Sequence, residues 1–218
     1  MRFKVVDSYQ GWLWRKLGEK CVENLQKHSF GAHLVETVDD ARELILKMIH
    51  DFETFGFGGS DTTRALGIME ELKKRGKIIY DHWQDGLSDE EDLEMRLQQG
   101  RCDCFLCSAN AVAATGEVVN VDAMGNRTNG MSFGPKKVLI VAGMNKVAQD
   151  LDGALQRIRE VAAPMRAKSL GMQTPCAETG FCTDCNAPQR ICRITTILHR
   201  KPMRSDVTVV LINTALGF

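Results

Sequence analysis

Regular alternation between strand-like and helix-like segments is the feature that most constrains the fold of this 218-residue chain. In the first half, amphipathic stretches with helical spacing separate short apolar stretches, which read AHLVET, ETFGFGG, KIIYDH and CDCFLCS. Such alternation is typical of a parallel sheet covered by helices. The sequence therefore predicts an α/β fold with an open, mostly parallel sheet and helices on both faces.

The second half departs from this simple alternation. It contains two further predicted strands, EVVNVD and KVLIVAG, then a long predicted helix over 145–165 and a last strand, VTVVLIN. A chain of this length can bury one substantial core, so we interpret residues 1–218 as a single α/β domain. Residues 171–203 are interpreted as a cysteine-bearing excursion between its final helix and its final strand.

Charge and hydropathy exclude two classes of partner. The 28 basic and 28 acidic residues cancel without a long run of one sign, so we expect no nucleic-acid binding and no polybasic membrane patch. No stretch approaches the roughly 18 apolar residues of a membrane span, and residues 1–20 lack the apolar run of an export signal. We therefore expect a cytoplasmic protein whose cysteines are thiols or metal ligands.

Four of the eight cysteines lie in one short segment, PCAETGFCTDCNAPQRIC. The central Cys-x2-Cys pair lets two sulfurs reach one ion from a single turn, and the flanking cysteines can complete a tetrahedron. Four thiolates without a histidine suit an iron–sulfur cluster or zinc. The candidate ligands are Cys176, Cys182, Cys185 and Cys192. The alternative is that they are ordinary thiols in a folded excursion, disulfide-linked in air.

A second cysteine group has a different interpretation. Cys102, Cys104 and Cys107 fall in a predicted strand, where the first two point to one face and the third to the other. Because they cannot easily share an ion, we interpret them as buried core thiols.

A glycine-rich turn begins the segment GFGGSDTTRALGIMEEL, residues 56–72. Glycines let a ligand approach the backbone, and the polar residues that follow lie where unpaired N–H groups open a helix. Such a helix start attracts a phosphate or a carboxylate. The alternative is a tight turn with an ordinary helix cap, because caps and anion sites use the same residue types.

Polar residues also follow the predicted strand CDCFLCS. Ligands usually bind at the carboxyl ends of the strands in an open parallel sheet, so these residues are expected to converge on a single ligand site. They are Asn110, Asn120, Asp122, Asn126 and Arg127. Glu117 and Asp122 are the carboxylates available for acid–base chemistry. The alternative is a set of polar turn residues without a function.

Four stretches together resemble the LUD-domain family of lactate-utilisation proteins. They read FGGSDTTRALGIMEEL, DCFLCSANAVAATGEVVNVDAMGNR, FGPKKVLIVAGMNKVAQDLDGALQRIREVAAP and TPCAETGFCTDC with PQRIC. The resemblance implies the fold shared by ribose-phosphate isomerase, glucosamine-phosphate deaminase and CoA-transferases. Some family members belong to iron–sulfur systems that oxidise lactate to pyruvate. The C-terminal cysteine segment resembles that of a stand-alone branch of the family, which implies that this chain belongs to that branch.

The resemblance also implies a candidate pocket for a small anionic ligand. Arg127 would offer a bidentate fork to the anion, and Lys136 would be a further anion partner. Asp122 is the first candidate for an acid–base role, with Glu117 as the second. The candidate ligand-binding residues are Gly58, Gly59, Ser60, Thr62, Asn110, Asn120, Gly125, Asn126, Arg127 and Lys136.

Three functions stay open at this point. The leading hypothesis is an accessory or subunit protein of lactate-type organic-acid redox metabolism, which binds a small carboxylate or phosphate and a four-cysteine iron–sulfur or metal centre. The second is a self-contained isomerase or transferase acting on a sugar phosphate or an acyl-CoA. The third is a non-enzymatic module that docks onto an iron–sulfur protein partner. A homo-oligomer is compatible with each.

Overall fold

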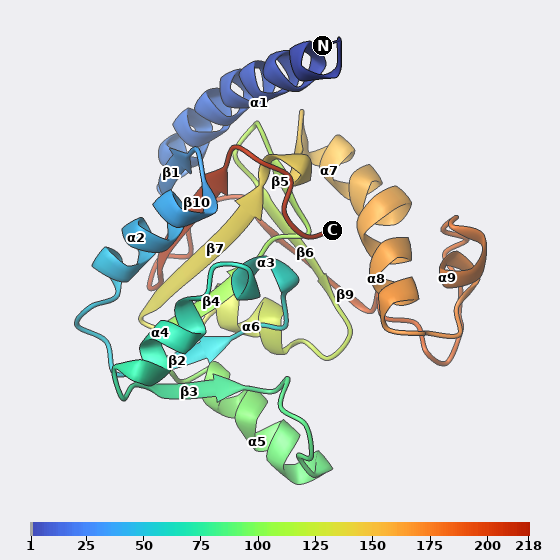
Figure 1. The fold of residues 1–218 in the computed structure, drawn as a ribbon. Coiled ribbons are helices and arrows are strands. Elements are labelled where there is room, and N and C mark those ends of the chain that lie inside the picture. The colour runs from blue at the N-terminus through green and yellow to red at the C-terminus, as the bar shows by residue number, and fades with distance from the viewer. Residues whose placement is uncertain (1) are drawn as a thin grey trace.

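A six-stranded parallel sheet forms the centre of the computed structural model, which describes residues 2–218, with side chains from Ser8 onward (Figure 1). Its strand order is β1-β10-β7-β4-β2-β3, and each neighbouring pair runs parallel. The strands are β1 (Gly31–Val35), β2 (Thr54–Phe57), β3 (Ile78–Asp81), β4 (Cys104–Ser108), β7 (Lys137–Gly143) and β10 (Asp206–Ile212). The predicted α/β fold class is confirmed.

Helices cover both faces of this main sheet. They are α1 (Arg2–Lys27), α2 (Val38–Met48), α3 (Asp61–Arg64), α4 (Ile68–Lys74), α5 (Asp89–Gln99) and α6 (Asn126–Ser132). On β4, Phe105 joins a buried cluster with Leu25 of α1, whereas Leu106 joins a second cluster with Ile45 of α2. Successive strand residues point to opposite faces, so the apolar run of β4 needs a partner layer on each side.

A second, four-stranded sheet has the order β8-β5-β6-β9. Its strands are β5 (Ala111–Ala113), β6 (Val118–Asp122), β8 (Val147–Ala148) and β9 (Ile194–Leu198). The expectation of one sheet is therefore wrong for the stretch EVVNVD, which forms β6. Only residues 114–117 separate β5 from β6, which is too short for a parallel crossover, so the two strands pair antiparallel as a hairpin.

The helical stretch expected over 145–165 begins later and continues further. Residues Met144–Lys146 form the 3-10 turn η1, and the helix starts only at Asp150, whose side chain accepts a hydrogen bond from the N–H of Gly153. The run then passes through α7 (Leu151–Arg157), the π-helical turn η2 (Ile158–Ala162) and α8 (Ala163–Ser169). Pro164 lies in the first turn of α8, where its missing N–H interrupts the α-helical ladder.

The cysteine segment lies beyond α8, away from the main sheet (Figure 1). It contains the short helix α9 (Pro175–Thr179), and the chain then returns as β9, which pairs antiparallel with β6. The last part of the predicted 171–203 excursion is thus built into the second sheet. Across residues 2–218, the structure contains no helix that is both long and apolar enough to cross a membrane.

Gly134 provides a test of how closely a loop packs beside the main sheet. Its φ is +119°, and a Cβ atom there would lie 2.0 Å from the carbonyl oxygen of Gly100. We expect Gly134→Ala to lower the free energy of unfolding by about 3 kcal/mol or more, because positive φ and overlap with the backbone act together. Urea denaturation measures this loss.

Gly76→Ala is the matched control. Gly76 also has a positive φ, +72°, but nothing lies within 4 Å of the position of its Cβ. This variant should lose only about 1 kcal/mol, the cost of the left-handed backbone alone. Equal losses in the two variants would contradict the role assigned to the Gly134 contact.

Candidate functional site

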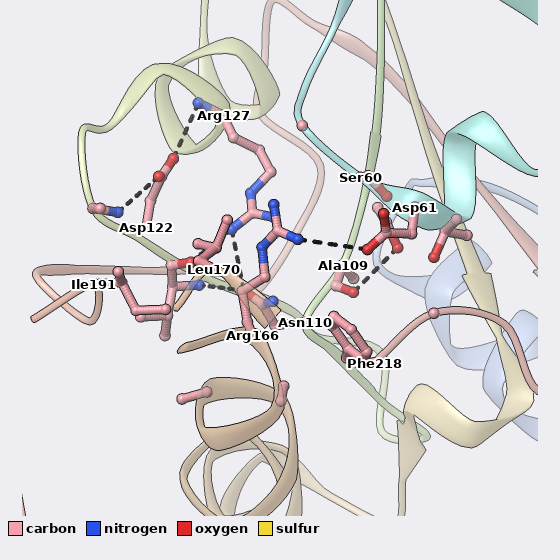
Figure 2. A pocket seen from close by; sticks show the side chains of 18 of the residues that line it. Ser60, Asp61, Ala109, Asn110, Asp122, Arg127, Arg166, Leu170, Ile191 and Phe218 are labelled. Atoms are coloured by element: carbon pink, nitrogen blue, oxygen red, sulfur yellow. Dashed lines mark hydrogen bonds and ion pairs between the residues drawn. The ribbon is translucent and has the colours of Figure 1, made fainter. Parts of the chain in front are cut away.

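A cavity of about 380 Å³ opens where β2, β4 and β7 of the main sheet end (Figure 2). One wall comes from the start of α3 and from the loop after β4, which contribute Ser60, Asp61 and Asn110. The opposite wall comes from α6 and α8, which contribute Arg127 and Arg166. The cavity therefore lies at the carboxyl edge of the parallel sheet, where such folds bind ligands.

Seven of the sequence-predicted site residues line this cavity together. They come from two separate motifs, the glycine turn and the segment after β4, which the order of β2 and β4 in the sheet makes neighbours. The residues are Gly59, Ser60, Thr62, Asn110, Asp122, Asn126 and Arg127.

Three predicted residues lie beside the cavity and support it. The N–H of Gly58 donates to the carbonyl oxygen of Leu106 at 2.9 Å, which holds the turn against β4. Asn120 is fully buried. Its side-chain nitrogen donates a hydrogen bond to the carbonyl oxygen of Ser108 at 3.0 Å, and its side-chain oxygen accepts one from the N–H of Asn110 at 2.9 Å. Gly125 occupies the left-handed cap position before α6.

Two predicted residues lie elsewhere. Lys136 precedes β7, so it lies at the amino edge of the sheet, where its exposed amine pairs with Asp103 at 2.8 Å. Glu117 lies in the β5–β6 turn and accepts a hydrogen bond from Thr115. Neither residue lines the cavity, so their assignment to the pocket is wrong. Spacing along the sequence could not show where β7 begins or that Glu117 lies in a tight turn.

Asp122 serves as a cap for α6. Its carboxylate accepts hydrogen bonds from the backbone N–H groups of Ala123 at 2.8 Å, Arg127 at 3.1 Å and Thr128 at 3.2 Å. These three donors position the first turn of α6, and with it the side chain of Arg127. An acid–base role for Asp122 stays a prediction.

The guanidinium groups of Arg127 and Arg166 lie next to each other on one wall of the cavity (Figure 2). One terminal nitrogen of Arg127 donates to the carbonyl oxygen of Val121 at 2.7 Å, while its buried Nε has no hydrogen-bond partner. Arg166 lies 3.6 Å from the carboxylate of Asp61. Burial, and then the charge of Arg127, lower the pKa of Arg166, with Asp61 acting in the opposite direction. Arg166 carried no sequence signal beyond its place in a helix.

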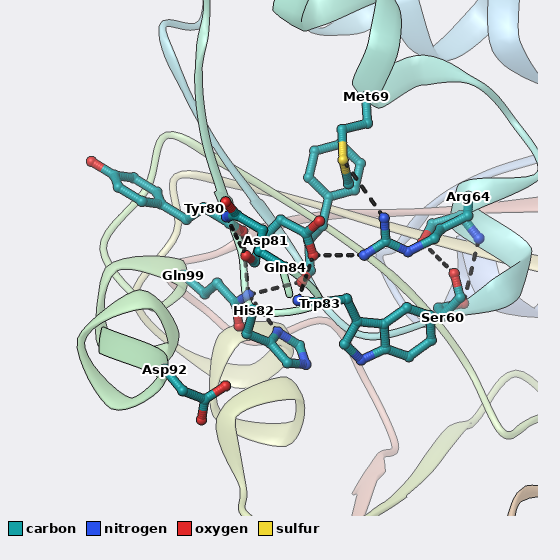
Figure 3. Close-up of polar contacts among 12 residues, drawn as sticks. Ser60, Arg64, Met69, Tyr80, Asp81, His82, Trp83, Gln84, Asp92 and Gln99 are labelled. Atoms are coloured by element: carbon teal, nitrogen blue, oxygen red, sulfur yellow. Dashed lines mark hydrogen bonds and ion pairs between the residues drawn. The ribbon is translucent and has the colours of Figure 1, made fainter. Parts of the chain in front are cut away.

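Aromatic and polar residues after β3 form the next part of the wall (Figure 3). Arg64 and Arg166 lie 4.7 Å and 5.0 Å from the ring centre of Trp83, so this ring holds two cations by cation–π contact. Arg64 is further held by Asp81 at 2.7 Å. Sequence reasoning missed Trp83, because a single tryptophan outside a motif has no distinctive spacing.

His82 also lines the cavity, although the scattered histidines gave no indication of a site. Burial, and then the charge of Arg96, lower the pKa of its imidazole to about 4. His82 is therefore neutral near pH 7. Its Nδ1 lies 2.8 Å from the amide nitrogen of Gln99, a donor, so Nδ1 accepts and Nε2 carries the proton.

Lys146 is the most unusual charged group of the site. Its side chain follows β7 and is only 4% exposed, and its Nζ lies 2.9 Å from Thr62 Oγ1 and 3.0 Å from Ser108 Oγ. Burial, and then the charges of Arg157 and Arg127, lower the pKa of the amine to about 7, although Asp61 acts in the opposite direction. Desolvation disfavours the charged form of a lysine.

The four-cysteine segment meets the cavity at Cys192, which lines it together with Ile191. Arg190 ties the segment together by donating to the carbonyl oxygens of Cys192, at 2.7 Å, and Cys185. Burial raises the pKa of Cys192 against the charge of Arg190, and the other three thiols of the segment act in the same direction as burial. Across the described part of the chain, however, no three His, Cys, Asp or Glu side chains are arranged to hold a metal ion.

The burial predicted for the other cysteine group is confirmed, but the predicted faces are wrong. Cys102 and Cys107 belong to one cluster and Cys104 to the other, because β4 begins only at Cys104 and Cys102 lies before the strand. Cys102, Cys104 and Cys107 are all buried in the two clusters of the main sheet. Burial raises the pKa of Cys107 to about 12, so its thiol stays protonated. These three side chains are core residues.

This chain is similar to known proteins in sequence pattern and in fold. Residues 18–212 match the family model described as the LUD domain. The crystal structure of a DUF162 family protein from Deinococcus radiodurans is similar, with a TM-score of 0.53 and 14% sequence identity over 91% of this chain and 98% of that one. At this identity the similarity concerns the fold. No curated protein gave a significant match.

Lys146→Met tests the charge state of the buried amine. The folded-state pKa of about 7 lies below the ordinary 10.5, so the stability linked to this group is lost as the pH falls from about 10 to about 7. Relative to wild type, we therefore expect the free energy of unfolding of Lys146→Met to increase as the pH is lowered over that range. Urea denaturation at several pH values measures the difference.

Lys136→Met controls for the loss of a lysine at the other edge of the sheet. The hydroxyls left by Lys146→Met keep acceptors of their own, Leu216 O for Thr62 and Ala109 O for Ser108, so the variant should fold. A constant difference between Lys146→Met and wild type across the pH range would contradict the lowered pKa.

Proposed function

Because the chain belongs to the LUD-domain family, we propose that it binds a small organic anion, a carboxylate or a phosphate, in this cavity and acts in organic-acid redox metabolism of the lactate type. The observation that carries the proposal is the buried, unpartnered Nε of Arg127. A buried donor without an acceptor costs free energy, and an anionic ligand would supply the acceptor.

The charges of the cavity support an anion over a cation or a neutral ligand. Its lining contains three arginines, Arg96, Arg127 and Arg166, and two acidic side chains, Asp61 and Asp122. Arg96 is paired with Asp92 at 2.7 Å, which leaves Arg127 and Arg166 as the cations that face a ligand. Asp122 is occupied by backbone donors, and Asp61 lies nearest Arg166. A planar guanidinium fork can hold a carboxylate or a phosphate through two hydrogen bonds.

The size of the cavity supports a small ligand. Its volume of about 380 Å³ is near the lower end of the roughly 300–1,000 Å³ typical of small-molecule sites. Trp83 and Ile158 add apolar surface to its wall, which would exclude water from the bound anion. A short organic acid or a small phosphorylated metabolite fits this description.

Arg127→Gln tests the anion site. Glutamine keeps a polar side chain but removes the charge and the Nε donor, so we expect the affinity for the bound anion to fall about 10-fold or more. Isothermal titration calorimetry with pyruvate, lactate, inorganic phosphate and dihydroxyacetone phosphate would first identify which anion binds wild type, and then measure the loss.

Lys136→Met serves as the control for this experiment. Its cationic side chain lies at the amino edge of the sheet and contacts Asp103, so its removal should leave the affinity unchanged. Equal weakening by Arg127→Gln and Lys136→Met, or no binding of any of the four anions to wild type, would contradict the proposal.

We further propose that the four-cysteine segment takes up an iron–sulfur cluster or a zinc ion. Supporting this, the thiols of Cys176, Cys182 and Cys185 lie near enough for their charges to act on Cys192, and thiolates are suitable ligands for either group. The described thiols do not form a preformed ligand set, so binding would require the segment to close. We also propose that an iron–sulfur protein partner docks at this segment.

Elemental analysis of protein purified without oxygen tests the metal proposal. We expect iron with sulfide, or zinc, bound to wild type and lost from the double variant Cys182→Ser/Cys185→Ser. The control is Cys21→Ala, which removes a buried thiol that donates to the carbonyl oxygen of Ala113, far from the segment in sequence and in the fold. Metal-free wild type, or metal retained by the double variant, would overturn the proposal.

A further inference from the structure

We propose that Lys146 is a nucleophile that forms an imine with a carbonyl compound carrying a carboxylate or phosphate group. This inference rests on the proposed function, because it adds a covalent step to the anion held in the same cavity. It also names the substrate class: a 2-oxo acid or a keto phosphate, in which a reactive carbonyl lies close to the negative charge.

The hydroxyl groups around the amine act as acceptors. Thr62 lies 3.3 Å from the carbonyl oxygen of Leu216, and Ser108 lies 3.2 Å from the carbonyl oxygen of Ala109, so each hydroxyl donates its own proton there. Both hydroxyl oxygens consequently present lone pairs to Lys146 Nζ, at 2.9 Å and 3.0 Å. The amine thus has two hydrogen-bond acceptors.

Two acceptors match a neutral amine. An ammonium group has three N–H donors, whereas a neutral amine has two donors and one lone pair. Both donors of the neutral form are satisfied by Thr62 and Ser108, which leaves the lone pair available for attack. Within residues 8–218, Lys146 forms no ion pair with a carboxylate, so its direct partners are the two neutral hydroxyls.

The surroundings of Lys146 also favour the neutral form of its amine. Burial and the neighbouring guanidinium groups of Arg157 and Arg127 disfavour its charged form, and they lower its pKa to about 7 against the effect of Asp61. A lysine in such surroundings is a nucleophile at neutral pH, because a large fraction of it is unprotonated.

The amine is buried and still borders the cavity. Lys146 lines it together with Arg127, so an anion paired with Arg127 would lie in the same chamber as the amine. Gly217 packs over the amine with a φ of +66°, and a Cβ atom at that position would lie 2.4 Å from Thr62 Oγ1 and 3.1 Å from Lys146 Nζ. Only a glycine allows the backbone to hold these groups so closely.

The step balances without an oxidant or a reductant. The nitrogen lone pair attacks the carbonyl carbon, and the new C–N bond forms as the carbonyl electron pair moves to oxygen. That oxygen takes up both hydrogens of the amine and leaves as water, so a C=N bond replaces the C=O bond. Meanwhile the carboxylate or phosphate of the substrate accepts hydrogen bonds from Arg127, which would hold the carbonyl near Lys146.

Reductive trapping tests the inference. Wild-type protein would be incubated near pH 7 with sodium cyanoborohydride and either pyruvate or dihydroxyacetone phosphate, which separates the carboxylate source from the phosphate source. Intact mass and peptide mapping would locate the stable secondary amine. We expect one adduct per chain on Lys146, with about 10-fold or more label there than on the exposed Lys136.

Two controls isolate the carbonyl and the amine. Lactate has the charge and nearly the shape of pyruvate without its carbonyl, so it should slow trapping by competition and form no adduct itself. Lys146→Arg keeps a cation that cannot form an imine, so it should lose the adduct while its melting temperature reports that it is folded.

The outcomes separate the two proposals. If calorimetry shows that pyruvate or dihydroxyacetone phosphate binds but Lys146 carries no adduct, the imine is overturned and the anion site stands. The same conclusion follows if Lys146→Arg acquires as much label as wild type. If neither pyruvate nor dihydroxyacetone phosphate binds while lactate or inorganic phosphate does, the imine is overturned and the anion site stands. If none of the four anions binds and Lys146 carries no adduct, the anion site and the imine are both overturned.

Discussion

Burial of both faces of the parallel main sheet is the constraint on which the rest of the structure depends. β4, β7 and β10 are enclosed by helices on either side, so polar side chains can only emerge where the strands end. Because the strands are parallel, their carboxyl ends share one edge. Thr62 follows β2, Ser108 ends β4 and Lys146 follows β7, and these three groups meet there in one set of hydrogen bonds.

Desolvation then determines the chemistry of that edge. Lys146, Arg157 and Arg166 are partly or wholly removed from water, and burial is the largest cause of the lowered pKa of each. Carboxylates offset only part of the positive charge at this edge, because the carboxylate of Asp122 accepts hydrogen bonds from the backbone at the start of α6. The result is a small chamber that favours an anion and contains an amine with reduced charge. The second sheet and α8 close it, and they bring Cys192 to its wall.

The candidate site was predictable where its residues lie within single motifs. The glycine turn and the segment after β4 each follow a recognisable strand, so Ser60, Thr62, Asn110 and Arg127 could be placed at strand ends from periodicity alone. Lys136 was misplaced because it precedes β7 instead of following it. Of the second sheet only β6 was predicted as a strand, from the stretch EVVNVD. The sheet itself was missed because β5 and β8 are three and two residues long, too short for a clear alternation.

By itself, the sequence determined the α/β class, the buried cysteines of β4 and the LUD-family resemblance, because each depends on local periodicity or on a contiguous motif. Only the tertiary structure decided which charged groups share the cavity. Lys146, Arg166 and Trp83 come from separate elements with no common spacing, and strand order and helix packing bring them together. The charge state of Lys146 was likewise undetermined, since it depends on desolvation and on neighbours distant in the chain.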